Sequence, residues 1–301
     1  MTTHPLNAAF AIKDHLKIVE GPGGFPMAEI TAKGGSARVS VYAGQVLSYR
    51  ADGQAEDLMF LSEKAYYAPG KAIKGGTPIC WPWFGPDPEG KGRPGHGIAR
   101  NRMWELLGGE VHKDGRVTVR LGFGDSAETR AVWPHAFFLE LAVTVGPTLR
   151  LALTTRNTGA EAFPLTQGLH TYFRVGDIAQ VQVRGLEDVL YLDNLDKCAK
   201  KSAPGPIVVN AEMDRIYTAL KGDMIIEDRA LGRRIAITSG GSNSAVVWNP
   251  WAATTASMAD LVPDAYTRMI CVETTNAKAD VIDVAPGQQH TLTAEYVIKG
   301  I

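Results

Sequence analysis

Short stretches of alternating or β-branched residues recur along the whole chain, and Gly, Pro, Asn or Asp separates them. This pattern is typical of β-strands that bury one face in a sheet. Patterns typical of helices are few, and parallel strand–helix–strand units are not indicated. The sequence therefore predicts an all-β fold. The segments expected to form strands are residues 37–49, 116–123, 137–145, 148–157, 178–183, 234–238, 245–248, 269–273 and 290–298.

The predicted strands fit a β-sandwich that forms one domain. Gly146 and Pro147 join two of them by a tight connection, which indicates an antiparallel hairpin. The chain has 301 residues, of which 45% are hydrophobic, so it can bury a large core. All-β chains of this length commonly fold as one unit. We expect a single domain over residues 1–301.

Charge and targeting signals favour a cytoplasmic protein that binds a small molecule. The formal net charge is -1, which gives no global reason to bind nucleic acid or a membrane surface. Residues 1–15 lack a basic segment followed by an apolar one, and no apolar run approaches the roughly 18 residues of a membrane span. Cys80, Cys198 and Cys271 are widely spaced and odd in number, so we expect reduced thiols. Protein partners are not readable from the sequence.

Two irregular segments, residues 69–104 and 249–268, interrupt the strands and are rich in Gly, Pro and aromatic residues. Such loops often carry function on a rigid scaffold. Between positions 71 and 102, six basic residues stand against two acidic ones, an excess of four positive charges. Trp81, Trp83 and Phe84 offer flat faces on which a sugar could pack. An anionic sugar would suit this loop, although each of these residues could instead be core or solvated surface.

A histidine and a glutamate stand in apolar surroundings and suggest acid–base chemistry. His170 lies among apolar and small residues, where a histidine is more often structural than catalytic. Glu273 ends an apolar run that is typical of a buried strand, and an unpaired carboxylate is costly to bury. A partner histidine would indicate that this buried glutamate has a functional role.

Several motifs in order along residues 74–277 carry a resemblance to a known family: KGGTPICWPWFGP, HGIARNRMWEL, TQGLHTYF, MDRIY, VVWNPW and CVETTNA. The chain resembles the glucose-6-phosphate 1-epimerase group of the aldose 1-epimerases over most of its length. The resemblance implies a galactose-mutarotase-like β-supersandwich of antiparallel sheets. It also implies a hexose-6-phosphate mutarotase, an isomerase that interconverts the α and β anomers of glucose 6-phosphate or a related hexose 6-phosphate.

By the same resemblance, the catalytic residues are His170 as the acid and Glu273 as the base. His96 and Asp214 match positions that bind sugar hydroxyls, while Lys74 and Arg100 would bind the phosphate. Relatives usually carry arginine at the position of Lys74, and a lysine acts on phosphate as a point charge without a bidentate fork. Lys71 and Arg102 are either helpers or surface charges. Mutarotation needs one acid and one base, so neither cofactor nor metal is expected.

Other readings of the sequence have less support. The run from Gly122 to Ala127 matches G-x-G-x-x-A, but Pro134 would cut short any helix after it, so a dinucleotide site is not expected. His135 lies in an aromatic setting that suggests a packed corner. The alternative to the enzyme is an inactive carbohydrate-binding or regulatory module on the same fold. A third reading is a glycoside-processing enzyme, in which Glu273 and Asp214 would form the carboxylate pair.

Overall fold

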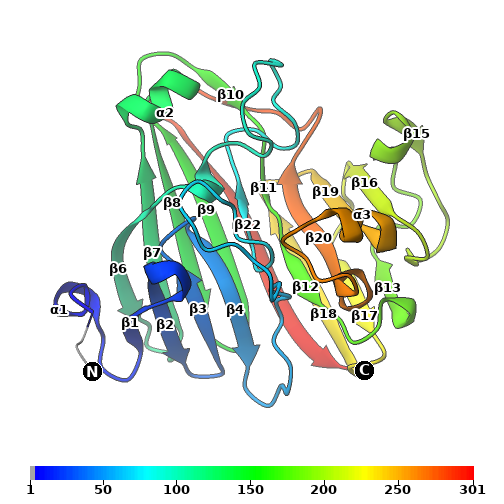
Figure 1. Cartoon of the computed structure of the whole chain (residues 1–301), viewed down its shortest axis with the longest axis horizontal. Helices are drawn as coiled ribbons and strands as arrows, with labels where there is room; N and C mark the ends of the chain where they lie inside the picture. Colours follow the sequence, from blue (N-terminus) through cyan, green and yellow to red (C-terminus); the bar gives the residue numbers. More distant parts are fainter. Residues whose placement is uncertain (1–3) are drawn as a thin grey trace.

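The computed structural model describes residues 4–301, so residues 1–3 of the amino-terminal stretch lie outside it. Antiparallel β-sheets dominate the molecule, as the sequence predicts (Figure 1). Two eight-stranded sheets, a four-stranded sheet and a two-stranded sheet make up the structure.

The first eight-stranded sheet forms the back of the molecule and contains the predicted hairpin. Its strand order is β13-β17-β18-β22-β9-β8-β7-β6. The bounds are β6 Glu105–Val111, β7 Val117–Gly124, β8 Phe137–Val145, β9 Leu149–Asn157, β13 Val181–Arg184, β17 Met224–Asp228, β18 Arg233–Gly240 and β22 Gln289–Gly300. Burial alternates strictly along β8, as expected for a strand with one face toward the core.

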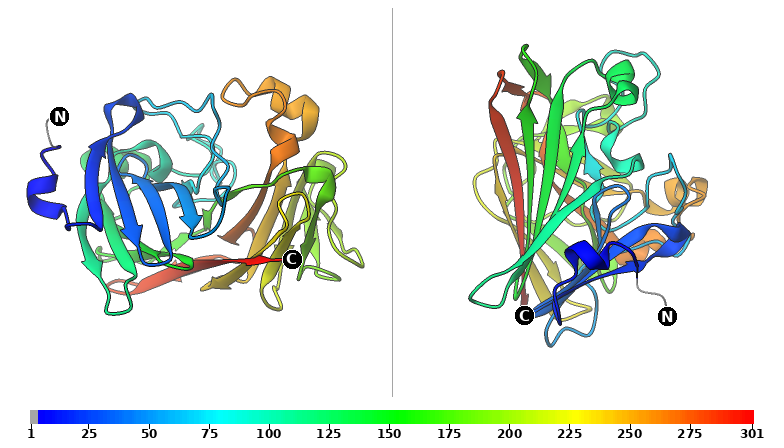
Figure 2. Two further views of the ribbon diagram at one scale, coloured as in Figure 1. Left: turned by 90° about the horizontal axis from the view of Figure 1, so that it is seen from below. Right: turned by 90° about the vertical axis from the view of Figure 1, so that its left-hand side faces the viewer.

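The four-stranded sheet covers one half of this back sheet. It consists of β1 Leu16–Glu20, β2 Pro26–Ala32, β3 Gly35–Ser40 and β4 Gln45–Ala51, in that order. β2 and β3 pack against β7 and β8, and the two layers are seen face to face in Figure 2. Val39 from one layer and Leu141 from the other are both fully buried in the shared core.

The second eight-stranded sheet covers the other half and carries the residues of interest. The strand order is β15-β14-β16-β19-β20-β11-β5, and β12 also pairs with β20. The bounds are β5 Ile79–Cys80, β11 Gln167–Leu169, β12 Tyr172–Arg174, β14 Tyr191–Asp193, β15 Ala199–Lys201, β16 Met213–Thr218, β19 Ser244–Asn249 and β20 Met269–Asn276. β20 packs against β22 of the back sheet. β10 Phe163–Leu165 and β21 Ile282–Val284 form the two-stranded sheet.

Helices are few and short. The α-helices are α1 Asn7–Phe10, α2 Ala127–Val132 and α3 Trp251–Ser257. The 3-10 helices are η1 Pro22–Gly24, η2 Ala99–Asn101, η3 Ile178–Gln180, η4 Asn194–Asp196 and η5 Ala265–Arg268. Within residues 4–301, no helix combines the length and the apolar character needed to cross a lipid bilayer.

Two predicted strands are wrong in detail. Residues 37–49 form parts of β3 and β4, because Ala43 and Gly44 both adopt positive φ and turn the chain back. A Cβ on Gly44 would also lie 2.6 Å from the Trp104 ring, so only glycine fits this turn. Residues 178–183 begin as the 3-10 helix η3, and only Val181 onward is strand.

The dinucleotide-like run, residues 122–127, begins within β7 and leads into a helix of six residues. Ser126 caps this helix, α2, at its amino-terminal end. The next strand, β8, runs antiparallel to β7, with Glu140 opposite Gly122. A dinucleotide-binding unit requires parallel strands, so the structure agrees with setting that motif aside.

Candidate active site

One cavity on the second sheet brings together all six residues that the sequence analysis selected. Its volume is about 880 Å³, which suits a small organic ligand. The six residues in its lining are Lys74, His96, Arg100, His170, Asp214 and Glu273. Because they come from segments spread over 200 positions of the chain, the fold, and not local sequence, assembles the cavity.

A gap between two short strands places His170 opposite Glu273. β11 pairs with β20 over Asn276–Thr274, and β12 pairs with it over Cys271–Met269. His170 and Thr171 lie in the gap between β11 and β12, level with Glu273 on β20. The His170 ring can therefore leave the sheet on the side where Glu273 projects.

Hydrogen bonds from hydroxyl groups and the backbone anchor the segment that contains His170 and Thr171. Thr171 is fully buried, and its Oγ1 lies 2.7 Å from the hydroxyl of Tyr296 on β22 and 3.2 Å from Oγ1 of Thr77. The backbone N–H of His170 donates to the carbonyl of Pro78 at 3.0 Å. These bonds fix the short segment to both sheets and so set the position of the histidine.

The side chains of His170 and Glu273 are close together and buried, and each has a polar atom without a hydrogen bond to the described part of the chain. Nδ1 of His170 lies 3.3 Å from Oε1 of Glu273, and the residues are 7% and 1% exposed. Among residues 4–301, no group forms a hydrogen bond with His170 Nδ1 or Glu273 Oε2. Unsatisfied buried polar atoms are rare in native proteins, so these two indicate a place for a ligand.

Burial shifts both groups toward their neutral forms. It raises the pKa of Glu273 well above its ordinary value, and the nearby Asp214 raises it further while Arg100 opposes the shift. It also lowers the pKa of His170 well below its ordinary value, an effect reinforced by His96, Arg100 and Lys74. Burial therefore favours a protonated carboxyl beside a neutral imidazole.

His96 is a neutral hydrogen-bond donor. Its Nδ1 accepts from the backbone N–H of Gly85 at 3.3 Å, so the hydrogen of the neutral ring lies on Nε2. Burial lowers the pKa of His96 to about 3, and Arg100 and Lys74 add to this. The residue itself has positive φ, and a Cβ on the following Gly97 would collide with the Trp81 carbonyl.

Two basic residues from the predicted loop line the cavity. Lys74 precedes β5, and its Nζ lies 3.4 Å from Oδ2 of Asp260 in the second predicted loop. Arg100 lies in η2, and its Nη2 donates to the carbonyl of Gly95 at 3.1 Å. Lys278 is a third cation in the lining. The two irregular segments thus meet at this cavity, as their composition suggests.

The opposite wall comes from β16 and β19. Asp214 lies beside Trp248 in the sheet, and Asn194 donates to its Oδ1 at 2.8 Å. Burial raises the pKa of Asp214, and the hydrogen bond from Asn194 opposes that shift. Trp248 and Tyr172 also line the cavity, and the Tyr172 ring stacks on His170 with centroids 4.9 Å apart.

For the aromatic residues of the first loop, the structure decides mostly for the core and against contact with a ligand. Trp81 and Trp83 are 0% and 3% exposed, and both belong to the hydrophobic core. Nε1 of Trp81 donates to Thr155 at 2.9 Å, so this ring is held in the interior. Of the three, only Phe84 lines the cavity.

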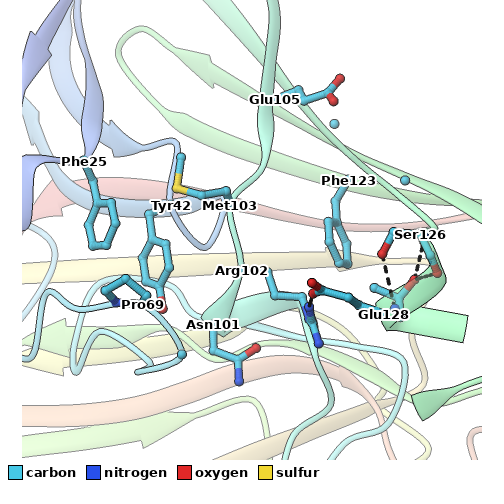
Figure 3. Close-up of a pocket in the computed structure, with 14 residues that line it drawn as sticks. Phe25, Tyr42, Pro69, Asn101, Arg102, Met103, Glu105, Phe123, Ser126 and Glu128 are labelled. Atoms are coloured by element: carbon cyan, nitrogen blue, oxygen red, sulfur yellow. Dashed lines mark hydrogen bonds and ion pairs between the residues drawn. The ribbon is translucent and has the colours of Figure 1, made fainter. Parts of the chain in front are cut away.

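The possible phosphate helpers also lie elsewhere. Arg102 lines a second cavity of about 420 Å³ and forms an ion pair of 2.8 Å with Glu128 (Figure 3). The stacked rings of Phe25 and Tyr42 form another part of this lining. Lys71 is exposed, and its carbonyl accepts from the Tyr42 hydroxyl.

His135 lies in a packed aromatic corner and the cysteines are unpaired in the described residues, as the sequence predicts. The His135 ring packs against Trp133 and Phe163, with centroids 4.4 and 5.2 Å apart. All three cysteines lie within the described residues and are free thiols. Four further residues line the cavity without having been predicted: Tyr172, Asn194, Trp248 and Lys278. Tyr172 and Trp248 stand inside the motifs TQGLHTYF and VVWNPW, which is a usable signal in the sequence.

Comparison with known proteins identifies the family of the chain. The family model for aldose 1-epimerase matches residues 26–297. A Cenchrus ciliaris protein named "Putative glucose-6-phosphate 1-epimerase" is 36% identical, covering 91% of this chain and 84% of its own. An Escherichia coli protein of the same name is also 36% identical, covering 80% of each chain.

Solved structures show the same fold. A Salmonella typhimurium protein described as a "putative mutarotase" superposes with a TM-score of 0.90 at 29% identity, covering 99% of this chain and 100% of its own. A galactose mutarotase-like protein from Clostridium acetobutylicum gives 0.74 at 16% identity, covering 95% and 98%, which supports the fold alone. With a family model that spans most of the sequence and a galactose-mutarotase-like architecture, the chain belongs to the aldose 1-epimerase family.

Proposed function

We propose that this chain is a hexose-6-phosphate mutarotase that interconverts the α and β anomers of glucose 6-phosphate or a related hexose 6-phosphate. One observation carries the proposal: His170 and Glu273 face each other at 3.3 Å in a cavity that Lys74 and Arg100 also line. The names of the relatives from Cenchrus ciliaris and Escherichia coli support a phosphorylated substrate.

The proposed reaction needs two proton transfers. Glu273 takes the proton from the O1 hydroxyl while His170 gives a proton to the ring oxygen O5, and the C1–O5 bond breaks to give the open aldehyde. Rotation about C1–C2 presents the other face of the carbonyl. O5 then attacks C1, His170 takes back its proton, and Glu273 returns one to O1. Each group ends in its starting state.

Bound phosphate would favour the protonation state that this mechanism requires. The pair holds one transferable proton, either on the Glu273 carboxyl or on the His170 imidazole. Lys74 and Arg100 both lower the pKa of His170. A phosphate dianion between these cations offsets their charge and so makes the imidazolium less costly. The phosphate of the substrate would thereby favour the imidazolium form of His170, which is the acid of the proposed reaction.

The ring hydroxyls have matching partners on both walls. Nε2 of His96 carries the hydrogen and can donate to a hydroxyl oxygen, while Asp214 can accept from a hydroxyl. Trp248 and Phe84 offer apolar surface in the same lining for the C–H faces of the sugar. The cavity thus offers a partner for each part of a hexose phosphate.

Exchange NMR on equilibrated glucose 6-phosphate tests the proposal. The cross-peaks between the two anomeric protons are followed with and without protein, with glucose as the comparison sugar. Faster exchange for the phosphate supports the proposal. Equal acceleration of both sugars would keep the mutarotase and remove the phosphate specificity. No acceleration, with retained binding, would identify an inactive carbohydrate-binding module instead.

A further inference from the structure

A third potential metal ligand lies beside the acid–base pair. Cys271 precedes Glu273 by two positions on β20, so both side chains project from the same face of the sheet. One nitrogen of His170, the sulfur of Cys271 and a carboxylate oxygen of Glu273 all lie within 4.8 Å of one another. All three residues are buried, and Cys271 is 0% exposed.

The spacing is close to that of a tetrahedral zinc site. Bond lengths of about 2.0–2.2 Å to nitrogen and oxygen place two such ligands about 3.4 Å apart around a tetrahedral ion. His170 Nδ1 and Glu273 Oε1 are 3.3 Å apart. A zinc–sulfur bond of about 2.3 Å requires the thiolate to stand about 3.6 Å from each of the others. The sulfur lies within 4.8 Å of a ring nitrogen of His170 and a carboxylate oxygen of Glu273, so it must approach them by no more than about 1.2 Å.

Buried lone pairs on His170 and Glu273 are a second observation in favour of a metal ion. His170 Nδ1, one of the two atoms that are 3.3 Å apart, is buried, and the described part of the chain leaves it without a hydrogen bond. The same holds for Oε2 of Glu273, the second oxygen of the carboxylate whose Oε1 faces His170. A sugar hydroxyl could occupy one of them, but a cation that accepts several lone pairs at once fits the cluster as a whole. The nitrogen and sulfur donors favour zinc over magnesium or calcium, which prefer oxygen.

We propose that His170 and Glu273, which line the cavity, and the fully buried Cys271 beside them form an inhibitory site for zinc(II). Three protein ligands leave a fourth position for water, as in other open zinc sites. On binding, the Cys271 thiol and the Glu273 carboxyl each release a proton to solvent, and they bond to the ion as thiolate and carboxylate beside the neutral His170 imidazole. The metal occupies the lone pairs that the acid–base pair needs, so it competes with proton transfer. The inhibition rests on the proposed function, whereas the metal binding does not.

The activity test uses the full-length protein with buffered free zinc. Anomer exchange of glucose 6-phosphate is measured for the wild type, Cys271→Ala and Cys80→Ala. Cys80 is a matched control because it is also a fully buried thiol in the same sheet but stands outside the cluster. We expect zinc to inhibit the wild type and Cys80→Ala alike, with recovery on adding EDTA. Cys271→Ala should need at least tenfold more zinc.

A binding test separates this proposal from the mutarotase assignment. Cobalt(II) replaces zinc in tetrahedral sites, and a thiolate ligand gives it an intense near-ultraviolet charge-transfer band. The band should develop in the wild type and Cys80→Ala and be lost in Cys271→Ala and in Cys271→Ser, the second variant in case the first does not fold. Equal zinc inhibition in Cys271→Ala, or absence of the band in the wild type, would overturn the proposal even if mutarotation is confirmed.

Discussion

His170 and Glu273 lie 3.3 Å apart, yet no hydrogen bond joins Nδ1 of the ring to the carboxylate. A structural pair would close such a gap, because a buried unsatisfied atom costs about 1–3 kcal/mol. The gap between β11 and β12 holds the histidine, while a continuous strand holds the glutamate. The strand pairing thus sets the distance between His170 and Glu273. A ligand can bond to His170 Nδ1 and Glu273 Oε2, the two atoms without a hydrogen bond in the described part of the chain.

Substitution of Arg100 should weaken the action on phosphorylated sugar selectively. Removal of a charged hydrogen-bond donor costs about 1.5–3 kcal/mol, so Arg100→Ala should raise KM for glucose 6-phosphate roughly 10- to 100-fold. Exchange of glucose should not fall, because the loss of Arg100 also removes a charge that lowers the pKa of His170. Arg102→Ala is the matched control, because Arg102 lies in the same loop but lines the other cavity. Equal losses for the two sugars would argue against a phosphate site at Arg100.

Free oxyanion should activate the enzyme toward a sugar that lacks phosphate. Phosphite bound at Lys74 and Arg100 would offset the charges that lower the pKa of His170, so glucose exchange should speed up as phosphite is added. The effect should saturate and should be lost in Arg100→Ala. Exchange NMR on glucose measures it. A rate that falls or stays constant with phosphite would show that the phosphate does not act through His170.

Thr171 should act as a positioning residue. Thr171→Val keeps the shape but loses the hydroxyl that contacts Tyr296 and Thr77, so stability should fall by about 1–3 kcal/mol. Because His170 would be held less firmly, kcat should fall severalfold with little change in KM. Thr274→Val serves as the control, since Thr274 is buried in β20 and bonds to Ser239. If both variants lower kcat equally, the effect is not specific to the His170 segment.

Glu273 should make the protein less stable as pH rises. Its folded-state pKa is raised above the ordinary value of 4.5, so the folded state binds more protons than the unfolded state above that pH. Stability is therefore lost between pH 4.5 and the folded-state pKa, by at most about 1.4 kcal/mol per pH unit. Glu273→Gln removes this loss. Urea unfolding at pH 5, 6 and 7 should show a growing advantage for the variant; an advantage that does not change with pH would contradict the shift.

The sequence predicts the long strands and the fold class well. β8 matches its predicted bounds because nine residues of strict alternation leave little choice. β11 and β12 have three residues each and were not predicted, since pairing with the distant β20 defines them. The error over residues 37–49 has a local cause: Ala43 gives no signal of the positive φ that it adopts. The single-domain assignment and the cytoplasmic location stay predictions.

The candidate site was predictable as a set of residues but not as a geometry. His170 and Glu273 stand out as polar residues in apolar runs, yet nothing local shows that they meet. For Trp81 the sequence left open a place in the core or a face toward the sugar, and the surrounding layers bury it. Asp260 was not selected because its contact with Lys74 depends on two loops folding together.

The most direct test of the central claim is the rate of anomer exchange in Glu273→Gln and His170→Asn, measured by exchange NMR at saturating glucose 6-phosphate. Circular dichroism would first confirm that both variants fold. If the two side chains transfer the protons, each variant should lose about 10²- to 10⁴-fold in kcat while still binding the sugar. Wild-type rates in either folded variant would contradict the acid–base assignment.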